Sequence, residues 1–180
     1  MNTTLQTNKT KKLCFTAVCA ALACAGTFVA VPLPIGYFNL GDIFVLCSAW
    51  CLGPVWGAAA AGVGTALADI LMGYVTYAPA TLIIKALVAV AAYTVFAHLA
   101  PKNAALGKEL PFRILAAVAG EIIMVGGYFL FEALIMGFGT GALASVPGNC
   151  LQAVCGVIGA VLLSTALTAN KAAKQFIGMH

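Results

Sequence analysis

Residues 40–72 read LGDIFVLCSAWCLGPVWGAAAAGVGTALADILM, and this stretch decides the fold. It contains two acidic residues and no basic one, and most of the rest is apolar or small. The stretch is long enough for one extended helix, but Gly53-Pro54 lies near its middle, and a proline disfavours a continuous helix. The sequence therefore allows either one long helix or two short ones, near 40–52 and 54–72.

Apolar segments lie on both sides of this stretch. They fall near 13–31, 78–99, 112–136 and 147–169, and each can cross about 30 Å of hydrocarbon at about 1.5 Å per residue. The 180-residue chain is 63% hydrophobic and 8% charged, whereas about a quarter of a soluble domain is charged. The composition excludes a soluble protein and predicts an all-α integral membrane protein. Because no long polar connection interrupts it, residues 1–180 are expected to form a single domain, with 1–12 as a cytoplasmic tail.

Basic residues decide between one helix and two in the 40–72 stretch. Cytoplasmic segments of membrane proteins carry an excess of Lys and Arg. With a cytoplasmic N-terminus and six spans, eight of the nine basic residues lie on the cytoplasmic side: Lys9, Lys11, Lys12, Lys102, Lys108, Arg113, Lys171 and Lys174. With five spans, all those from Lys102 onward would lie outside. The charges therefore predict six transmembrane helices with both termini cytoplasmic, and the net charge of +4 reflects this orientation rather than binding to nucleic acid.

Polar side chains within the apolar segments are the first candidates for a functional site, because they are costly in lipid. Tyr77, Thr81 and Lys85 follow one another at a spacing of four, which places them on one helix face. The next segment contains a second set of polar side chains on one helix face. At about 100° of rotation per residue, offsets of 7 and 11 residues bring side chains to nearly the same angle around the helix. The members of this set are Glu121, Tyr128 and Glu132, and the last segment adds Asn149 and Gln152 in its outer turns.

On the six-span prediction these side chains surround an outward-facing polar cavity, closed by the loops at 32–39 and 73–78. Asp42, Asp69, Lys85, Glu132, Asn149 and Gln152 lie in the outer half of the membrane, with Glu121 nearer the middle. Alternatively, Lys85 only neutralises a carboxylate such as Glu132 or Asp69 and holds helices together. The aromatic residues of the outer loops, Tyr37, Phe38, Tyr74 and Tyr77, could form an interfacial belt or stack on a flat ring.

Small residues form a second pattern. Ala17, Ala21 and Ala25 give the first segment a smooth face, and small-xxx-small faces allow close helix packing in lipid. This face could pack within the protein or against a partner, whereas a similar face from Gly53 to Thr65 is expected to pack internally. The seven cysteines form no C-x-x-C pair, so neither a metal site nor a disulfide framework is predicted, and no cofactor is implied. The sequence also contains no phosphate-binding loop or other catalytic motif.

Five stretches resemble the substrate-binding S components of energy-coupling factor (ECF) vitamin transporters, and within them the riboflavin-type group. They are FNLGD at 38–42, LGP at 52–54, ALADILMGY at 66–74, YAPATLIIK at 77–85 and PGNCLQA at 147–153. The resemblance implies six helices that bind a vitamin-like solute near the outer face of a prokaryotic cell membrane. It further implies a membrane T component and two ABC ATPases as partners, with the face of Ala17, Ala21 and Ala25 docking on the T component.

The resemblance and the polar faces together predict a set of ligand-binding residues: Asn39, Asp42, Tyr77, Thr81, Lys85, Tyr128, Glu132, Asn149 and Gln152. The solute is expected to be a small heterocyclic vitamin or precursor, similar to pyridoxine, hydroxymethylpyrimidine or riboflavin, since a scaffold does not determine its ligand. The main alternative is a stand-alone transporter coupled to protons through a deep carboxylate such as Glu121. An enzyme is disfavoured, because Glu121 and Glu132 are separated by about 16 Å along a helix, too far to act on one bond.

Overall fold

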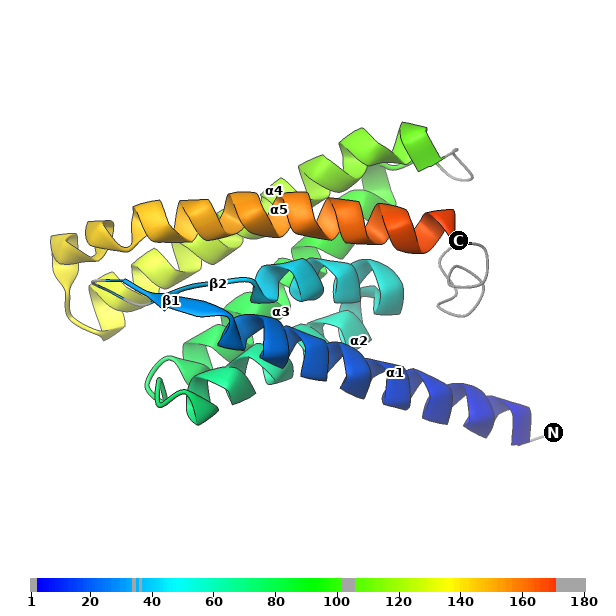
Figure 1. Cartoon of the computed structure of the whole chain (residues 1–180), viewed down its shortest axis with the longest axis horizontal. Helices are drawn as coiled ribbons and strands as arrows, with labels where there is room; N and C mark the ends of the chain where they lie inside the picture. The colour runs from blue at the N-terminus through cyan, green and yellow to red at the C-terminus, as the bar shows by residue number, and fades with distance from the viewer. Residues whose placement is uncertain (1–2, 34, 36, 102–105, 171–180) are drawn as a thin grey trace.

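The computed structural model describes residues 3–33, 35, 37–101 and 106–170 (Figure 1). Five α-helices follow one another: α1 (Thr3–Phe28), α2 (Gly41–Leu71), α3 (Ala78–Leu99), α4 (Leu106–Leu130) and α5 (Val146–Ala169). The predicted positions of Lys102, Lys171 and Lys174 lie outside the described residues. Five described segments are long and apolar enough to cross a membrane: Lys9–Phe28, Gly41–Leu71, Ala78–Leu99, Lys108–Ile135 and Gly139–Ala169. The all-helical membrane class is therefore confirmed.

Helix α2 is interrupted at Gly53, which has φ 81° and ψ −178° and is followed by Pro54. The positive φ is a conformation that glycine adopts without a steric penalty. Beyond the break the chain folds back. The Ser48 hydroxyl donates to the carbonyl of Gly57 at 3.2 Å, whereas in a straight helix these residues would be separated by about 13 Å. The two halves of α2 therefore lie side by side. This arrangement agrees with the prediction of a break in the helix at Gly53-Pro54.

Two short strands form a hairpin that the sequence did not predict. β1 (Ala30–Pro32) pairs antiparallel with β2 (Tyr37–Asn39), with Val31 opposite Phe38. The predicted first helix extended to residue 31, but α1 ends at Phe28 and the next residues form β1. The predicted end of the first helix is corrected here, since Val31 precedes Pro32 and the residue before a proline favours extended backbone.

The last turn of the fourth helical segment is not regular α-helix. α4 continues into the π-helical segment η1 (Phe131–Ile135), and the 3-10 segment η2 (Gly139–Ala144) connects it to α5. π-helical turns are rare and are frequently found at functional sites. This irregular part lies at the same end of the bundle as the β1–β2 hairpin (Figure 1).

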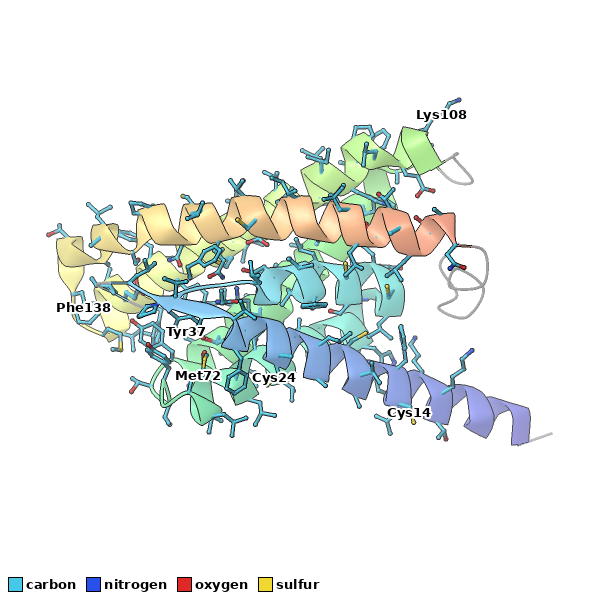
Figure 2. All side chains as sticks on the ribbon, in the orientation of Figure 1. Cys14, Cys24, Tyr37, Met72, Lys108 and Phe138 are labelled. Atoms are coloured by element: carbon cyan, nitrogen blue, oxygen red, sulfur yellow. The ribbon has the colours of Figure 1, made fainter. Side chains whose placement is uncertain are left out.

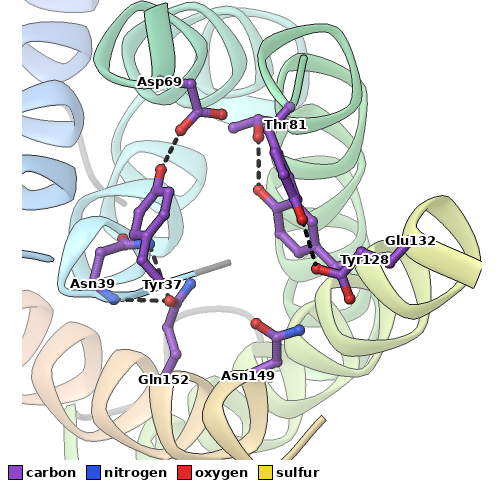
Figure 3. A pocket seen from close by; sticks show the side chains of 9 residues that line it. Tyr37, Asn39, Asp69, Thr81, Tyr128, Glu132, Asn149 and Gln152 are labelled. Carbon is purple, nitrogen blue, oxygen red and sulfur yellow. Dashed lines mark hydrogen bonds between the residues drawn. The ribbon is translucent and has the colours of Figure 1, made fainter. Parts of the chain in front are cut away.

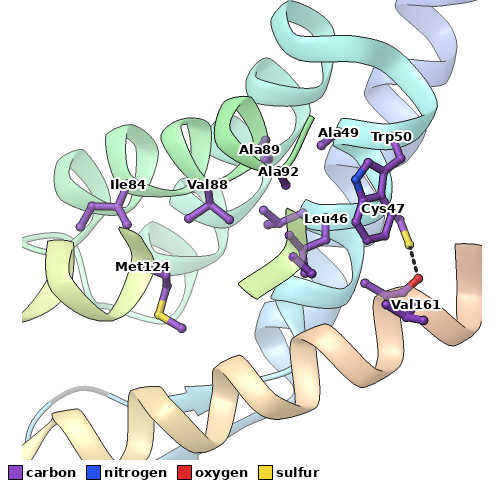
Figure 4. Close-up of a cluster of buried hydrophobic side chains, with 14 residues drawn as sticks. Leu46, Cys47, Ala49, Trp50, Ile84, Val88, Ala89, Ala92, Met124 and Val161 are labelled. Carbon is purple, nitrogen blue, oxygen red and sulfur yellow. Dashed lines mark hydrogen bonds between the residues drawn. The ribbon is translucent and has the colours of Figure 1, made fainter. Parts of the chain in front are cut away.

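The interior is packed from α2, α3, α4 and α5, as Figure 4 shows for Leu46, Val88, Met124 and Val161. Many large apolar side chains point outward instead, and they include Val55, Ile83, Ile122, Leu134 and Leu162. In water such a surface would be unfavourable, but in lipid it is the expected covering of a membrane-spanning bundle.

The two ends of the bundle are formed by different elements. The beginning of α1 and the end of α5 lie at one end, together with the beginning of α4 (Figure 1). Figure 2 places Lys108 at this end and Tyr37 and Phe138 at the opposite end. The hairpin end is the one that contains the site.

Candidate functional site

A pocket opens at the hairpin end of the bundle, between side chains from β2 and from the helical elements α2, α3, α4, η1 and α5 (Figure 3). It encloses about 320 Å³ of space not occupied by atoms, counting the part open to its surroundings. The pocket is lined by Tyr37, Asn39, Asp69, Tyr77, Thr81, Tyr128, Glu132, Asn149 and Gln152.

A hydrogen-bond network forms one wall of the pocket and links it to the core. The side-chain oxygen of Gln152 accepts from the Asn39 backbone N–H at 2.9 Å and from the Asn39 amide at 3.0 Å. The Gln152 amide nitrogen then donates to Asp42 at 2.6 Å. Because Asn39 also accepts from the Gly41 backbone N–H at 2.8 Å, the end of β2 and the start of α2 are held in one arrangement.

Asp42 forms a buried ion pair with Lys85 at 2.5 Å. The exposed fractions of the two side chains are 0% and 2%. The Lys85 ammonium also lies 5.4 Å from the ring centroid of Tyr128, within the range of a cation–π contact. Lys85 and Asp42 do not line the pocket; they lie behind it and hold Gln152 and Tyr128.

Two carboxyl groups face the pocket itself. Asp69 accepts a hydrogen bond from the Tyr37 hydroxyl, and Glu132 accepts from the hydroxyls of Ser145 and, at 3.4 Å, Tyr77. Glu132 lies in the π-helical segment η1, and Ser145 lies between η2 and α5. The irregular backbone after α4 thus brings a carboxyl group to the pocket with a hydroxyl donor beside it.

The tyrosine hydroxyls in these contacts are donors at physiological pH. Burial raises the pKa of Tyr37, and the neighbouring Asp69 carboxylate raises it further. Burial and then Glu132 raise the pKa of Tyr77 to about 12. Tyr128 donates to the Thr81 hydroxyl at 2.9 Å. Each of the three lining tyrosines therefore points a hydroxyl at a polar partner and leaves its ring to the pocket.

Asn149 is the lining residue whose polar group is left open. Its exposed fraction is 8%, and its side-chain nitrogen has no hydrogen-bond partner among the described residues. Figure 3 shows the amide pointing between Gln152 and Tyr128 into the pocket. A buried donor without a partner costs about 1–3 kcal/mol, so this group is suited to a hydrogen-bond acceptor on a ligand.

Glu121 lies deeper in the bundle. Its exposed fraction is 3%, and neither carboxyl oxygen has a hydrogen-bond partner among the described residues. A Cβ added to Gly156 would lie 2.8 Å from the Asp42 Cβ and 3.1 Å from a Glu121 oxygen. The absence of a side chain at Gly156 therefore lets α5 approach the Asp42–Glu121 region closely.

The structure brings seven of the nine predicted ligand-binding residues to the pocket lining: Asn39, Tyr77, Thr81, Tyr128, Glu132, Asn149 and Gln152. The predicted ligand-binding set did not include Tyr37 and Asp69, although the sequence placed Asp69 among the polar residues around the cavity and Tyr37 among the aromatic residues of the outer loops. Tyr37 could have been found from strand alternation, because in β2 it lies two residues before Asn39 and on the same face. Within the described part of the chain, no group of three or more His, Cys, Asp or Glu side chains could hold a metal ion.

The chain is similar in sequence to a known family of membrane proteins and to one uncharacterised protein. The family model described as ECF-type riboflavin transporter, S component, matches residues 7–169. An uncharacterised protein of Pyrococcus woesei, described as lying in the gap 3′ region, is 37% identical over 132 residues, which cover 72% of this chain and 82% of that protein.

Proposed function

The chain belongs to the family of ECF-type riboflavin transporter S components, and from this premise we propose that it is the high-affinity substrate-binding subunit of an ECF-type ABC importer. The family makes it a substrate-binding subunit of a vitamin transporter and a multi-pass membrane protein. The proposal adds that it captures a small heterocyclic vitamin or precursor in the pocket at the hairpin end. The observation that carries it is the pocket itself, where polar side chains from β2 and helices far apart in sequence converge.

We further propose six spans, with both termini on the cytoplasmic side of a prokaryotic cell membrane. The fold-back at Gly53 supports counting the halves of α2 as two spans. The beginning of α1 and the end of α5 lie at one end of the bundle (Figure 1), as an even number requires. The described lysines of α1 and α4 lie at that end, so the positive-inside rule makes it cytoplasmic and directs the pocket outward.

The first helix offers a surface for the proposed partners, a membrane T component and two ABC ATPases. Ala17, Ala21 and Ala25 are all exposed on α1. Thr16, Cys19, Ala23 and Thr27 form the buried face of the same helix. The alanine face is therefore free to pack closely against a helix of another protein. Because the sequence contains no phosphate-binding loop, we propose that ATP hydrolysis by the partners drives uptake.

One observation favours a second function, proton-coupled transport without partners. Glu121 is a buried carboxyl group with no hydrogen-bond partner among the described residues, and intramembrane carboxyl groups of this kind occur in proton relays. Uptake into vesicles that depends on the proton gradient and persists without ATPase subunits would favour this alternative over the importer.

The first experiment is mass spectrometry of the ligand released from protein purified in mild detergent after growth in rich medium. A stoichiometric heterocycle is expected. The variant Asn149→Ala should bind the released compound about tenfold more weakly, since one hydrogen bond from a buried donor is lost. Cys150→Ala, on the exposed side of the same helix, should bind it unchanged. Purification of an empty protein with no T component bound would argue against the proposal.

A further inference from the structure

We propose that the solute of this pocket is a cation: a small heterocycle that carries a protonated amine together with a hydrogen-bond acceptor. The inference rests on the proposed function and narrows it to a chemical class. It comes from the charges and open hydrogen-bonding groups of the pocket.

The first observation is that the described residues lining the pocket include two carboxyl groups and no basic side chain. Asp69 and Glu132 have exposed fractions of 1% and 2%, and Figure 3 shows them on different sides of the pocket. Both accept hydrogen bonds from hydroxyl groups, and the two oxygens of each carboxyl group offer further acceptor sites. Neither forms an ion pair with a described basic residue.

The second observation concerns the positions and partners of the described basic side chains. Lys85 is the described basic residue nearest the pocket, and its ammonium is committed to Asp42 at 2.5 Å. Arg113 pairs with Glu109 at 3.1 Å in the first turns of α4, and the described lysines of α1 and α4 lie at the opposite end of the bundle (Figures 1 and 2). With Asp69 and Glu132 ionised, the pocket carries an excess of negative charge in a low-dielectric setting, where an uncompensated carboxylate is costly. A cationic ligand removes this cost.

The third observation is the surface between the carboxylates. Tyr37, Tyr77 and Tyr128 line the pocket, and tyrosine rings attract cations as well as flat heterocycles. A Tyr37–Tyr74–Tyr77–Phe131 series of ring contacts, with centroids 4.7, 6.3 and 5.4 Å apart, continues from the lining. The lining of the pocket thus combines three tyrosines with two carboxyl groups.

The fourth observation is independent of charge. The Asn149 side-chain nitrogen is buried without a partner and points into the pocket, so it calls for an acceptor such as a ring nitrogen or carbonyl oxygen. Gln152 cannot supply an acceptor of its own to the ligand in the same way, because its oxygen already accepts two hydrogen bonds from Asn39. The pocket therefore matches a ligand with an ammonium group and a separate acceptor, and it repels phosphorylated or carboxylated forms.

The test uses two matched pairs of probes, with binding measured by calorimetry on the full-length protein in detergent. Each pair differs in one group, an aminomethyl against a hydroxymethyl: pyridoxamine against pyridoxine, and 4-amino-5-aminomethyl-2-methylpyrimidine against its hydroxymethyl counterpart. Riboflavin and pyridoxamine 5′-phosphate complete the set. At least one aminomethyl probe should bind about tenfold or more tightly than its hydroxymethyl partner, the gain of a charge-assisted hydrogen bond, and the phosphate should bind more weakly than pyridoxamine.

Isosteric variants then test whether the two carboxyl groups cause the preference for the amine. Asp69→Asn and Glu132→Gln should each reduce the preference for the amine at least threefold, whereas Glu109→Gln, at the other end of the bundle, should leave it unchanged. If a variant fails to fold, the wild-type ratios and the phosphate comparison still decide the question.

Each outcome supports or overturns the inference. Binding of a hydroxymethyl probe or riboflavin as tightly as the amines overturns it and leaves the proposed function intact. If none of the probes binds, the compound released from the purified protein decides: a basic amine supports the inference, and a neutral or anionic heterocycle overturns it. If no probe binds and no compound is released, the inference fails, and the proposed function fails with it only when no T component co-purifies.

Discussion

Replacing Lys85 with methionine should destabilise the protein strongly, because it leaves Asp42 charged and unpaired in the interior. Asp42 has an exposed fraction of 0%, and its two oxygens take the Lys85 ammonium at 2.5 Å and the Gln152 amide at 2.6 Å. After Lys85→Met only the amide donor remains. Methionine keeps most of the aliphatic volume of lysine, so a cavity contributes little to the loss.

Removing one partner of a buried ion pair costs about 3–5 kcal/mol. For a chain of this size, about 1 kcal/mol corresponds to roughly 2–4 °C in Tm, so Lys85→Met should lower Tm by roughly 6–20 °C. The measurement is thermal unfolding of detergent-solubilised protein, followed by the intrinsic fluorescence of Trp50 and Trp56. Lys108→Met, an exposed lysine on α4, is the matched control and should shift Tm by less than about 2 °C, as expected for a surface substitution.

A double variant separates the lost ion pair from lost packing. In Asp42→Asn/Lys85→Met the asparagine is neutral and its oxygen can still accept from Gln152, so the double variant should be more stable than Lys85→Met alone. A Tm for Lys85→Met within about 2 °C of wild type would refute the reasoning, since a buried unpaired carboxylate cannot be so inexpensive. A double variant less stable than the single one would show that the charge is not the cause.

Two further substitutions test other parts of the structure. Glu121→Gln removes an ionisable group that has no hydrogen-bond partner among the described residues, so Tm at neutral pH should stay within a few degrees of wild type or rise, and a loss of roughly 10 °C would mean that the carboxylate has a partner. Gly57→Ala should lower Tm, because the added Cβ would lie 2.8 Å from the Ala49 Cα, and backbone cannot move aside as a side chain can. Gly126→Ala, where an added Cβ meets nothing within 4 Å, should be neutral or slightly stabilising, and equal effects at the two glycines would contradict the fold-back of α2.

Helix positions were predictable because lipid imposes long apolar segments with few interruptions. The sequence placed a helix at 78–99, and α3 spans Ala78–Leu99. It also marked Gly53-Pro54 as a break, where the structure has a non-helical glycine. The β1–β2 hairpin was not predictable in this way, since two strands of three residues each are too short to give a usable period-2 signal.

The sequence predicted most of the residues that line the pocket, but it did not predict which carboxylate pairs with Lys85. Polar residues in apolar helices mark a site whatever their partners, and that reasoning found most of the lining. It named Glu132 or Asp69 as partners for Lys85, whereas the structure pairs Lys85 with Asp42. That choice depends on how closely helices approach, and close approach at Gly156 is a property of packing between α2 and α5 rather than of spacing along one helix.

The kind of partner that each buried carboxyl group has separates structural from ligand-binding roles better than burial does. Asp42 is satisfied by an ammonium and an amide, so another cation would gain little there. Asp69 and Glu132 receive hydroxyl donors, and a carboxylate has about four acceptor sites on its two oxygens. These two can therefore accept an ammonium without releasing the hydroxyls that orient them. Under the proposed function, Asp42, which the sequence placed in the ligand-binding set, therefore supports the pocket, and Asp69, which that set did not include, contacts the ligand.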